Sequence, residues 1–352
     1  MDLLMMAQPT GFWENILFWL ESWVGNYAIA IILITLLIKI VLLPFDFLNK
    51  YITKKNGIKQ AELQPELDKI KQRYGQNKEL LNKKTMELYN AKNYKVGGMC
   101  GIMLAYMAVT MLVFFTLLGS LNTVSYYKMY NEYESVKTAY ITTYEAVIAD
   151  GNKPDEFETI EKYAEKMAGD KTIEVYGDVK TGFLWIKNIW RPDTSNSPIM
   201  DYNTFSNNVG KLEGAEVPTE EEYNEIMQTL MQSEEYSGWN GYYILCILAA
   251  LATFASTYIN TLVQRFKAKR RNSELQQTME ASSKGMNIIM PIIMGLFTLL
   301  YTASFGLYIV TSSLFAMASG VVITLFVDKV MAKQIKKEKQ KSINTYDRSN
   351  LR

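Results

Sequence analysis

Hydrophobic positions gather in five long runs along the chain, and polar positions fill the segments between them. A bilayer core of about 30 Å needs about 20 helical residues at about 1.5 Å each, a length that these runs reach or approach. We expect membrane-spanning helices over residues 27–48, 96–121, 242–263, 286–301 and 307–327. The run at 286–301 is about 24 Å long by the same rise, so it must thin the bilayer or border a wet cavity. The pattern predicts an all-α polytopic membrane protein with five transmembrane helices.

Basic residues are unevenly distributed among the polar segments, although the whole chain has 37 Lys and Arg against 36 Asp and Glu. Segments 49–95, 264–285 and 328–352 carry 12, 6 and 8 Lys and Arg, respectively. Residues 1–26 carry none, and residues 122–241 carry 10 against 22 acidic residues. The positive-inside rule places the three basic segments in the cytoplasm. Five spans then put the N-terminus outside, the C-terminus inside, and residues 122–241 outside as an inserted extracytoplasmic segment.

The cytoplasmic segment 49–95 is expected to fold as a helical hairpin. Two thin apolar stripes are separated by residues 75–77, and Pro65 suits a helix start or a kink. Stripes this narrow cannot build a deep core, so the hairpin would project. Its basic surface suits anionic headgroups or ribosomal RNA, but the positive-inside rule explains the same charges equally well. A loop at 264–285 and a basic tail at 328–352 complete the cytoplasmic side.

The extracytoplasmic segments show several patterns. Residues 12–24 place aromatic and aliphatic side chains at helical spacing, which predicts an amphipathic helix within segment 1–26 in the outer interface, with a frayed leader as the alternative. Residues 183–194 (FLWIKNIWRPDT) predict a strap on the membrane surface. Helices are expected over residues 126–149, 155–168 and 217–235, the last with Thr219 and Glu222 spaced as a capping box. No motif indicates what segment 122–241 does.

Histidine is absent from the chain, and only two cysteines occur. These counts exclude His-based acid–base catalysis, a His/Cys zinc site and a disulfide framework. The outer segment has no Gly-rich phosphate loop and no metal-ligand cluster, and no span holds the aspartate pair of an intramembrane protease. Balanced charge argues against DNA binding. We therefore expect no proton-transfer catalysis by histidine, no catalytic residue, no cofactor and no metal.

Lys39 is the only basic residue inside any predicted span. A Lys at mid-bilayer costs about 2.5–3.5 kcal/mol on insertion scales, and Asp46 lies about 10 Å further along the helix, too far for direct contact. One alternative is that Lys39 reaches the inner headgroups; the other, which we favour, is that it lines a water-filled cavity. The polar span residues that would join this cavity are Thr35, Ser256, Asn260, Tyr308, Thr311 and Ser312. Taken singly, such residues are often packing residues bonded to their own backbone.

The sequence resembles the YidC/Oxa/Albino family of membrane-protein insertases. Four parts carry the resemblance: residues 28–44 (AIAIILITLLIKIVLLP); 64–74 (QPELDKIKQRY) with 88–89 and 97–100 (GGMC); 183–193 (FLWIKNIWRPD); and 290–291 (MP) with 306–313 (GLYIVTSS). Their order, their spacing and the five-span topology agree with the family over nearly everything except about residues 122–180. The second span departs from the family after GGMC, where its usual prolines and Gln are absent.

The resemblance implies a non-enzymatic, multi-pass protein of the bacterial plasma membrane that moves hydrophobic segments of nascent proteins into the bilayer. It implies a hydrophilic groove open to the cytoplasm and to lipid, with Lys39 at the position of the family's usual Arg. Lys keeps the charge but lacks the planar fork of donors. Thr35 and Tyr308 match positions implicated in substrate contact. Nascent membrane proteins would be the clients, with the ribosome and the Sec translocon as possible partners.

Two other classes of function remain open on the sequence. A small-solute transporter or channel is expected to show inverted repeats and several intramembrane charges, whereas this chain has one basic residue in its spans and no repeat. A receptor or scaffold would use the acidic outer segment as its sensor. Deleting roughly residues 125–180 distinguishes a receptor from an insertase, because a receptor that uses this segment as its sensor should lose function, whereas an insertase need not.

Overall fold

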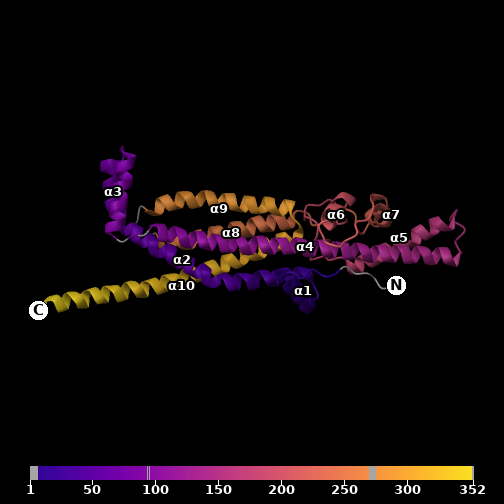
Figure 1. Ribbon diagram of the computed structural model, residues 1–352, viewed down its shortest axis with the longest axis horizontal. Helices are drawn as coiled ribbons and strands as arrows, with labels where there is room; N and C mark the ends of the chain where they lie inside the picture. Colours follow the sequence, from indigo (N-terminus) through magenta and orange to yellow (C-terminus); the bar gives the residue numbers. More distant parts are fainter. Residues whose placement is uncertain (1–6, 93, 95, 269–274, 351–352) are drawn as a thin grey trace. The chain divides into compact units, whose positions relative to one another are not determined.

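The computed structural model describes residues 7–92, 94, 96–268 and 275–350. The described part is built from helices (Figure 1), with one isolated β-bridge between Phe183 and Ile186. In chain order the helices are α1 (Phe12–Val24), α2 (Tyr27–Tyr74), α3 (Lys78–Ala91), α4 (Val96–Asp150), α5 (Ile160–Val179), α6 (Tyr202–Val209), α7 (Glu220–Gln232), α8 (Ile244–Ala268), α9 (Leu275–Leu300) and α10 (Ala303–Asn350). The all-α class predicted from the sequence is confirmed.

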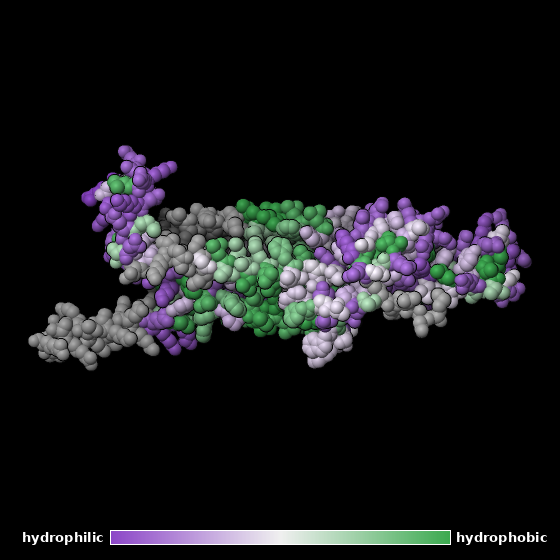
Figure 2. Space-filling model, in the orientation of Figure 1, coloured by the Kyte–Doolittle hydropathy of each residue, from purple (hydrophilic) through white to green (hydrophobic). Residues whose placement is uncertain are grey.

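Four helical segments of the described chain are long and apolar enough to cross a membrane. They are Tyr27–Lys59, Leu104–Asp150, Ile244–Val263 and Ala303–Gln334, and Ile288–Leu300 is a shorter apolar helix. The short segment corresponds to the span predicted at 286–301. Figure 2 shows the described surface of α9 as mainly hydrophobic and that of α3 as mainly hydrophilic. This is a polytopic membrane protein; the span boundaries and the orientation stay predictions.

The chain divides into two compact units. The first unit comprises Met1–Leu36, Phe114–Leu251 and Pro291–Thr311, and the second comprises Leu37–Val113, Ala252–Met290 and Ser312–Arg352. Parts of the predicted segments 1–26, 49–95, 264–285 and 328–352 lie outside the described residues, namely 1–6, 93, 95, 269–274 and 351–352.

In the first unit, residues 183–194 form a non-helical strap, as predicted. The Ile189 carbonyl accepts hydrogen bonds from the Ser304 backbone N–H at 3.1 Å and from the Ser304 hydroxyl at 3.0 Å. The Arg191 carbonyl accepts from the Ala303 N–H at 2.9 Å, and the Asp193 carboxylate accepts from the Leu245 N–H at 2.9 Å. The strap therefore satisfies backbone groups at the starts of α8 and α10, which have no helical partners of their own.

Trp190 and Glu132 form the centre of the strap's packing. Trp190 is 1% exposed, and its ring centroid lies 5.1 Å from that of Tyr27. One carboxylate oxygen of Glu132 accepts from Trp190 Nε1 at 2.7 Å, from the Thr181 N–H at 3.2 Å and from the Thr181 hydroxyl at 3.3 Å. Three donors on one oxygen hold the buried Glu132 carboxyl of α4 in place.

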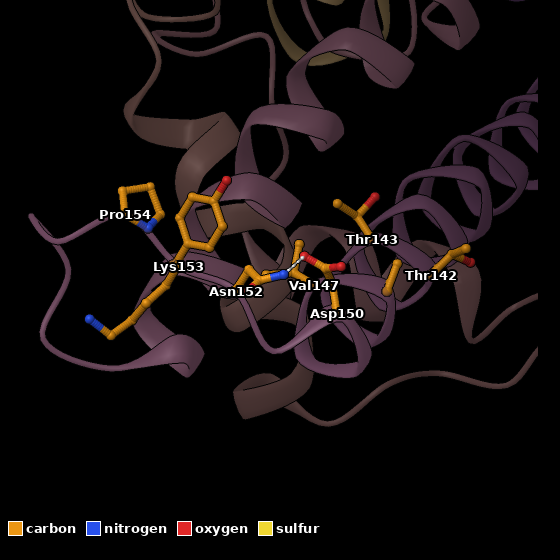
Figure 3. Close-up of a pocket in the computed structure, with 9 residues that line it drawn as sticks. Thr142, Thr143, Val147, Asp150, Asn152, Lys153 and Pro154 are labelled. Carbon is orange, nitrogen blue, oxygen red and sulfur yellow. Dashed lines mark hydrogen bonds between the residues drawn. The ribbon is translucent and has the colours of Figure 1, made fainter.

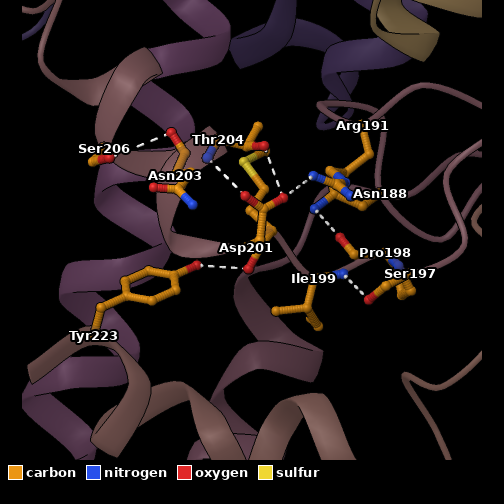
Figure 4. A network of polar contacts seen from close by, with 11 residues as sticks. Asn188, Arg191, Ser197, Pro198, Ile199, Asp201, Asn203, Thr204, Ser206 and Tyr223 are labelled. Atoms are coloured by element: carbon orange, nitrogen blue, oxygen red, sulfur yellow. Dashed lines mark hydrogen bonds and ion pairs between the residues drawn. The ribbon is translucent and has the colours of Figure 1, made fainter. Parts of the chain in front are cut away.

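A further polar network surrounds Asn188, which is buried in the strap. Its N–H donates to Asn240 Oδ1 at 2.8 Å, and Asn240 Nδ2 donates back to the Asn188 carbonyl at 2.8 Å. Figure 4 shows the Asn188 side chain directed at the Pro198 carbonyl, 3.0 Å away, and Asp201 bonded to Thr204 and paired with Arg191 at 3.5 Å. Asp201 thereby caps α6, a helix that the sequence analysis did not predict.

Helix boundaries in the outer segment depart from all three predictions, and the helix expected at 217–235 is the shorter α7, Glu220–Gln232. The helix expected at 126–149 is the end of α4, a single helix of 55 residues. The helix expected at 155–168 is α5, which begins at Ile160 because the Thr159 side chain accepts from the Lys162 N–H and caps it there. The Thr219 side chain accepts from the Glu222 N–H at 3.2 Å, as the capping spacing predicts.

In the second unit, α2 continues past the membrane-crossing residues to Tyr74. It passes through Pro65, which was expected at a start or a kink, and ends at the predicted break. The Asn77 side chain accepts from the Leu80 N–H at 3.1 Å and starts α3. Lys92 pairs with Glu66 at 2.8 Å and joins the hairpin's two arms. An apolar cluster packs α10 on α2; it contains Ile323, Val327, Met331, Leu43, Phe47, Tyr51 and Ile58.

Candidate functional site

A polar groove of about 370 Å³ lies within the second unit. Helices α2, α4, α8 and α10 all contribute side chains to it. The lining residues are Lys39, Leu42, Asp46, Asn49, Lys50, Tyr106, Thr110, Ser256, Thr257, Asn260, Phe315, Ala316, Ser319, Gly320 and Ile323. Each of the four helices contains a segment apolar enough to cross a membrane, so the groove gathers polar side chains where hydrophobic ones are the rule.

One face of α2 supplies the charges of the groove. Lys39, Asp46 and Lys50 are seven and four positions apart, and a turn of about 100° per residue brings all three to the same side. The Lys50 amine donates to the Gly320 carbonyl at 2.8 Å, and Asp46 accepts a hydrogen bond from the Tyr106 hydroxyl. In the described chain, no carboxylate lies within ion-pair distance of Lys39. Lys39 is therefore a charge that the fold leaves facing the groove.

The opposite wall comes from α8 and α10. Ser256 is 7% exposed, and its carbonyl accepts from Asn260 Nδ2 at 2.8 Å. Asn260 Nδ2 also lies 3.4 Å from the Ala316 carbonyl of α10. A Cβ on Gly320 would fall 2.1 Å from Asn260 Oδ1, so only glycine at this position leaves space for the amide. Thr253 and Ser313 join the same two helices through hydroxyls 3.0 Å apart.

Three of the predicted cavity residues, Lys39, Ser256 and Asn260, line this one groove. Thr35 is fully buried in the first unit, and its hydroxyl donates to the Ile31 carbonyl at 2.6 Å. This is the packing role that span Ser and Thr residues often have.

The other predicted residues lie elsewhere. Tyr308 belongs to an aromatic cluster of the first unit, with its ring 5.9 Å from Phe114 and 6.1 Å from Phe305. Thr311 and Ser312 are half-buried and are not among the residues that line the groove. Of the predicted set, then, the groove gathers Lys39 of α2 with Ser256 and Asn260 of α8, but not Thr35, which also lies on α2.

Sequence reasoning missed most of the remaining lining residues. Asp46 had a usable signal, because it is two helical turns after Lys39 on the same face. Lys50 follows it by one further turn. Tyr106 and Thr110 lie in an apolar run in which no periodicity sets them apart, so they emerge only once α4 is placed beside α2 within this unit.

A larger hollow, of about 570 Å³, lies in the first unit at the end of α4 (Figure 3). Asp150, Asn152 and Lys153 line it, and the Asn152 side chain donates to Asp150 at 3.3 Å. All three of these side chains are exposed, so water already solvates them. The groove differs because its charges lie between membrane-crossing helices, and we take it as the candidate site.

The fold and the groove define a class: polytopic helical membrane proteins with a charged, polar groove among their spans. The family model described as 60Kd inner membrane protein matches residues 19–331. The chain belongs to this family, the YidC/Oxa family, and is a multi-pass protein of the bacterial inner membrane.

Curated relatives named "Membrane protein insertase YidC" are similar to parts of the chain. The protein from Fusobacterium nucleatum is 41% identical over 103 residues, 29% of this chain and 46% of its own. The protein from an Anaeromyxobacter species is 35% identical over 120 residues, 33% and 21% of the two chains. The protein from Caldanaerobacter subterraneus is 36% identical over 95 residues, 27% and 44%. The matches cover less than half of each relative, and no solved structure matches the chain significantly.

Proposed function

We propose that this protein is a membrane-protein insertase that moves hydrophobic segments of nascent proteins into the bilayer through the groove centred on Lys39. The observation that carries the proposal is the groove itself: an ammonium without an ion-pair partner among the described residues faces a hollow bordered by polar side chains of four apolar helices. The names of the curated relatives support the same activity. The protein would be a non-enzymatic chaperone of insertion, without a cofactor.

The groove would replace bulk water for a short polar tail that crosses ahead of an apolar segment. At about 30 Å³ for each water, 370 Å³ holds roughly a dozen waters. The hydroxyl and amide groups of Ser256, Thr257 and Asn260 add fixed partners. An acidic tail residue would also be attracted to Lys39, by about 1 kcal/mol at 4 Å in bulk water and about 4 kcal/mol at an effective dielectric constant of 20.

The apolar segment would then leave for lipid, driven by the burial of apolar surface at about 25 cal/mol per Å². In this scheme the basic hairpin, residues 49–95, and the tail, residues 328–352, face the cytoplasm and meet the ribosome or anionic headgroups first. Nascent membrane proteins are the clients, and the Sec translocon is a partner for some of them. The short apolar helix Ile288–Leu300 reduces the thickness still to be crossed.

Reconstitution tests this function. Purified protein in liposomes receives a single-span client with an acidic tail and, in parallel, the same client with a neutral tail. Wild-type protein should insert both clients, whereas empty liposomes should not. No insertion above the empty liposomes would overturn the proposed function.

Substitutions at Lys39 test the role of the charge. Lys39→Ala should slow the acidic-tail client about tenfold, equivalent to about 1.4 kcal/mol, and the neutral-tail client less. Lys39→Arg keeps the charge and should insert both clients at the wild-type rate. Full activity of Lys39→Ala on the acidic-tail client would refute the electrostatic role while leaving the activity itself intact.

A further inference from the structure

Three residues other than glycine have a positive φ in the described chain: Leu184 at 54°, Tyr242 at 59° and Tyr243 at 64°. This left-handed conformation costs roughly 1–2 kcal/mol for a residue with a Cβ. All three side chains are nevertheless large and exposed, at 76%, 57% and 41%. Largely exposed side chains held in an unfavourable backbone conformation gain little from burial in the fold, so their placement needs another explanation.

These residues lie in two segments of the first unit that hydrogen bonds join, although about 60 positions separate them in the chain. The Lys187 N–H donates to the Asn240 carbonyl at 3.1 Å, and the Lys187 amine donates to the Ser237 carbonyl at 2.9 Å. These bonds tie the turn that carries Leu184 to the loop before α8. Trp239 is 41% exposed, with its ring 5.4 Å from Tyr243. We call Leu184, Trp239, Tyr242 and Tyr243 the apolar rim.

Three of the four rim residues, Trp239, Tyr242 and Tyr243, lie just before the membrane-crossing segment of α8. Tyr243 directly precedes Ile244, where the membrane-crossing segment Ile244–Val263 begins. The first turns of that segment expose Ile247, Leu248 and Leu251, at 57%, 38% and 58%. Trp and Tyr are enriched where a span meets the headgroups. Tyr242 and Tyr243 of the rim therefore extend the exposed apolar surface of the span at its first turn.

We propose that the apolar rim is a lipid anchor that sits in the headgroup–acyl boundary at the start of α8, with Leu184 as its tip. Two features favour lipid over a client or a second copy of the chain. The rim is continuous with an apolar helix surface that a bilayer must cover, and its backbone is fixed by the hydrogen bonds of the strap. It would hold the strap to the membrane independently of the groove.

Depth measurements test the anchor. Leu184→Cys and, as the matched control, Asn203→Cys on the exposed face of α6 are made in a background with Cys100 and Cys246 replaced by alanine. Each is labelled with an environment-sensitive fluorophore and reconstituted into phosphatidylcholine vesicles. Lipids with a shallow acyl-chain quencher should quench the probe at position 184 several-fold more than the probe at 203, and aqueous iodide should do the reverse.

Two outcomes would overturn the proposal. Equal quenching at both positions by iodide would mean that Leu184 faces water. A blue-shifted probe at 184 that shallow lipid quenchers do not reach would mean that protein covers the rim. Neither outcome depends on insertion activity, so the proposed function could fail while the anchor stands.

Leu184→Gly separates anchoring from a role in the folded core. Glycine adopts positive φ without strain, so the thermal midpoint in detergent should stay within about 2 °C of wild type or rise. A fall of more than about 5 °C would assign Leu184 to the core and contradict the anchor.

Discussion

Glu132 of the first unit and Lys39 of the second are two ionisable side chains of the described chain whose surroundings differ. One oxygen of Glu132 accepts three hydrogen bonds, and the cavity beside it measures about 30 Å³, about one water. Lys39 faces a groove of about 370 Å³ without a carboxylate in ion-pair distance among the described residues. A buried carboxyl with saturated partners serves the fold, whereas a charge that faces an open, polar hollow is available to something that enters it.

The comparison implies that substitutions around Glu132 should change stability, and that substitutions around the groove should change activity. The hydrogen-bond partners of Glu132 lie in the first unit, and those of the groove residues lie in the second. Effects on stability and effects on activity should therefore be separable. The following changes test this separation, beginning with the largest expected effect.

Trp190→Ala should destabilise the protein most, by about 3–5 kcal/mol, because it removes a fully buried ring and one of the Glu132 donors. Thermal unfolding in detergent, followed by circular dichroism, measures the loss. Trp23→Ala is the matched control, since Trp23 is 74% exposed, and it should stay within about 0.5 kcal/mol of wild type. Equal effects of the two substitutions would contradict the structural role of the strap.

Stability should also depend on the pH through Glu132, which lies on α4 eleven residues beyond the predicted end of the span at 121. Burial raises the pKa of this carboxyl from 4.5 to about 7, although its donors act in the opposite direction. The unfolded chain loses this proton first as the pH rises. Stability is therefore greatest below about pH 4.5, declines by about 3 kcal/mol as the pH passes through 7, and is flat above that.

Unfolding midpoints of wild type and Glu132→Gln between pH 5 and pH 8 check this dependence. Gln keeps an acceptor oxygen but cannot ionise, so the difference between the two proteins should grow toward pH 8. Glu221→Gln, at an exposed position of α7, should leave the wild-type dependence unchanged. A Glu132→Gln profile parallel to wild type would show that Glu132 does not titrate in this range.

Gly320→Ala should act on the groove instead. The new methyl group would displace the Asn260 amide into the hollow, at a cost of about 1–3 kcal/mol, and insertion should slow several-fold. Gly57→Ala is the control, because nothing lies within 4 Å of a Cβ at this helical position, and it should be neutral or stabilising by about 0.5–1 kcal/mol. Unchanged insertion by a folded Gly320→Ala protein would argue against passage through this space.

Tyr106→Phe is expected to change stability least, by up to about 1 kcal/mol, because water in the groove can replace the lost hydroxyl at Asp46. Tyr258→Phe, at a 45% exposed position on α8, provides the control. A loss of stability from Tyr106→Phe as large as that from Trp190→Ala would mean that the groove is closed and dry. The groove would then not differ from the surroundings of Glu132.

Much of the fold could be predicted because apolar run length and isolated charges are strong signals. The spans followed from the runs, and Lys39 stood out as the single basic residue within them. The strap was predicted as non-helical because aromatic residues and Pro192 interrupt any helical period. The break before α3 followed from Gly75 and Asn77.

Other features depend on tertiary placement and leave little trace in the sequence. Glu132 is one acid among 22 in its segment, and nothing local distinguishes it from those that face water. Helix α6 has eight residues, too few turns for its apolar positions to stand out in the sequence, and its Asp201 cap and buried Phe205 become evident only with the strap in place. Thr35 and Ser256 look alike as span hydroxyls, yet one bonds to its own helix and the other lines the groove.

The most direct test of the groove is to ask where an arrested client's polar tail lies. A photo-crosslinking residue is placed in the protein at Ser256, which lines the groove, or at Phe254, which is 43% exposed on the same helix and outside the lining. The tail should crosslink from position 256 and not from 254, and Lys39→Ala should weaken the crosslink of an acidic tail. Crosslinking from 254 alone, with no product from 256, would contradict passage through the groove.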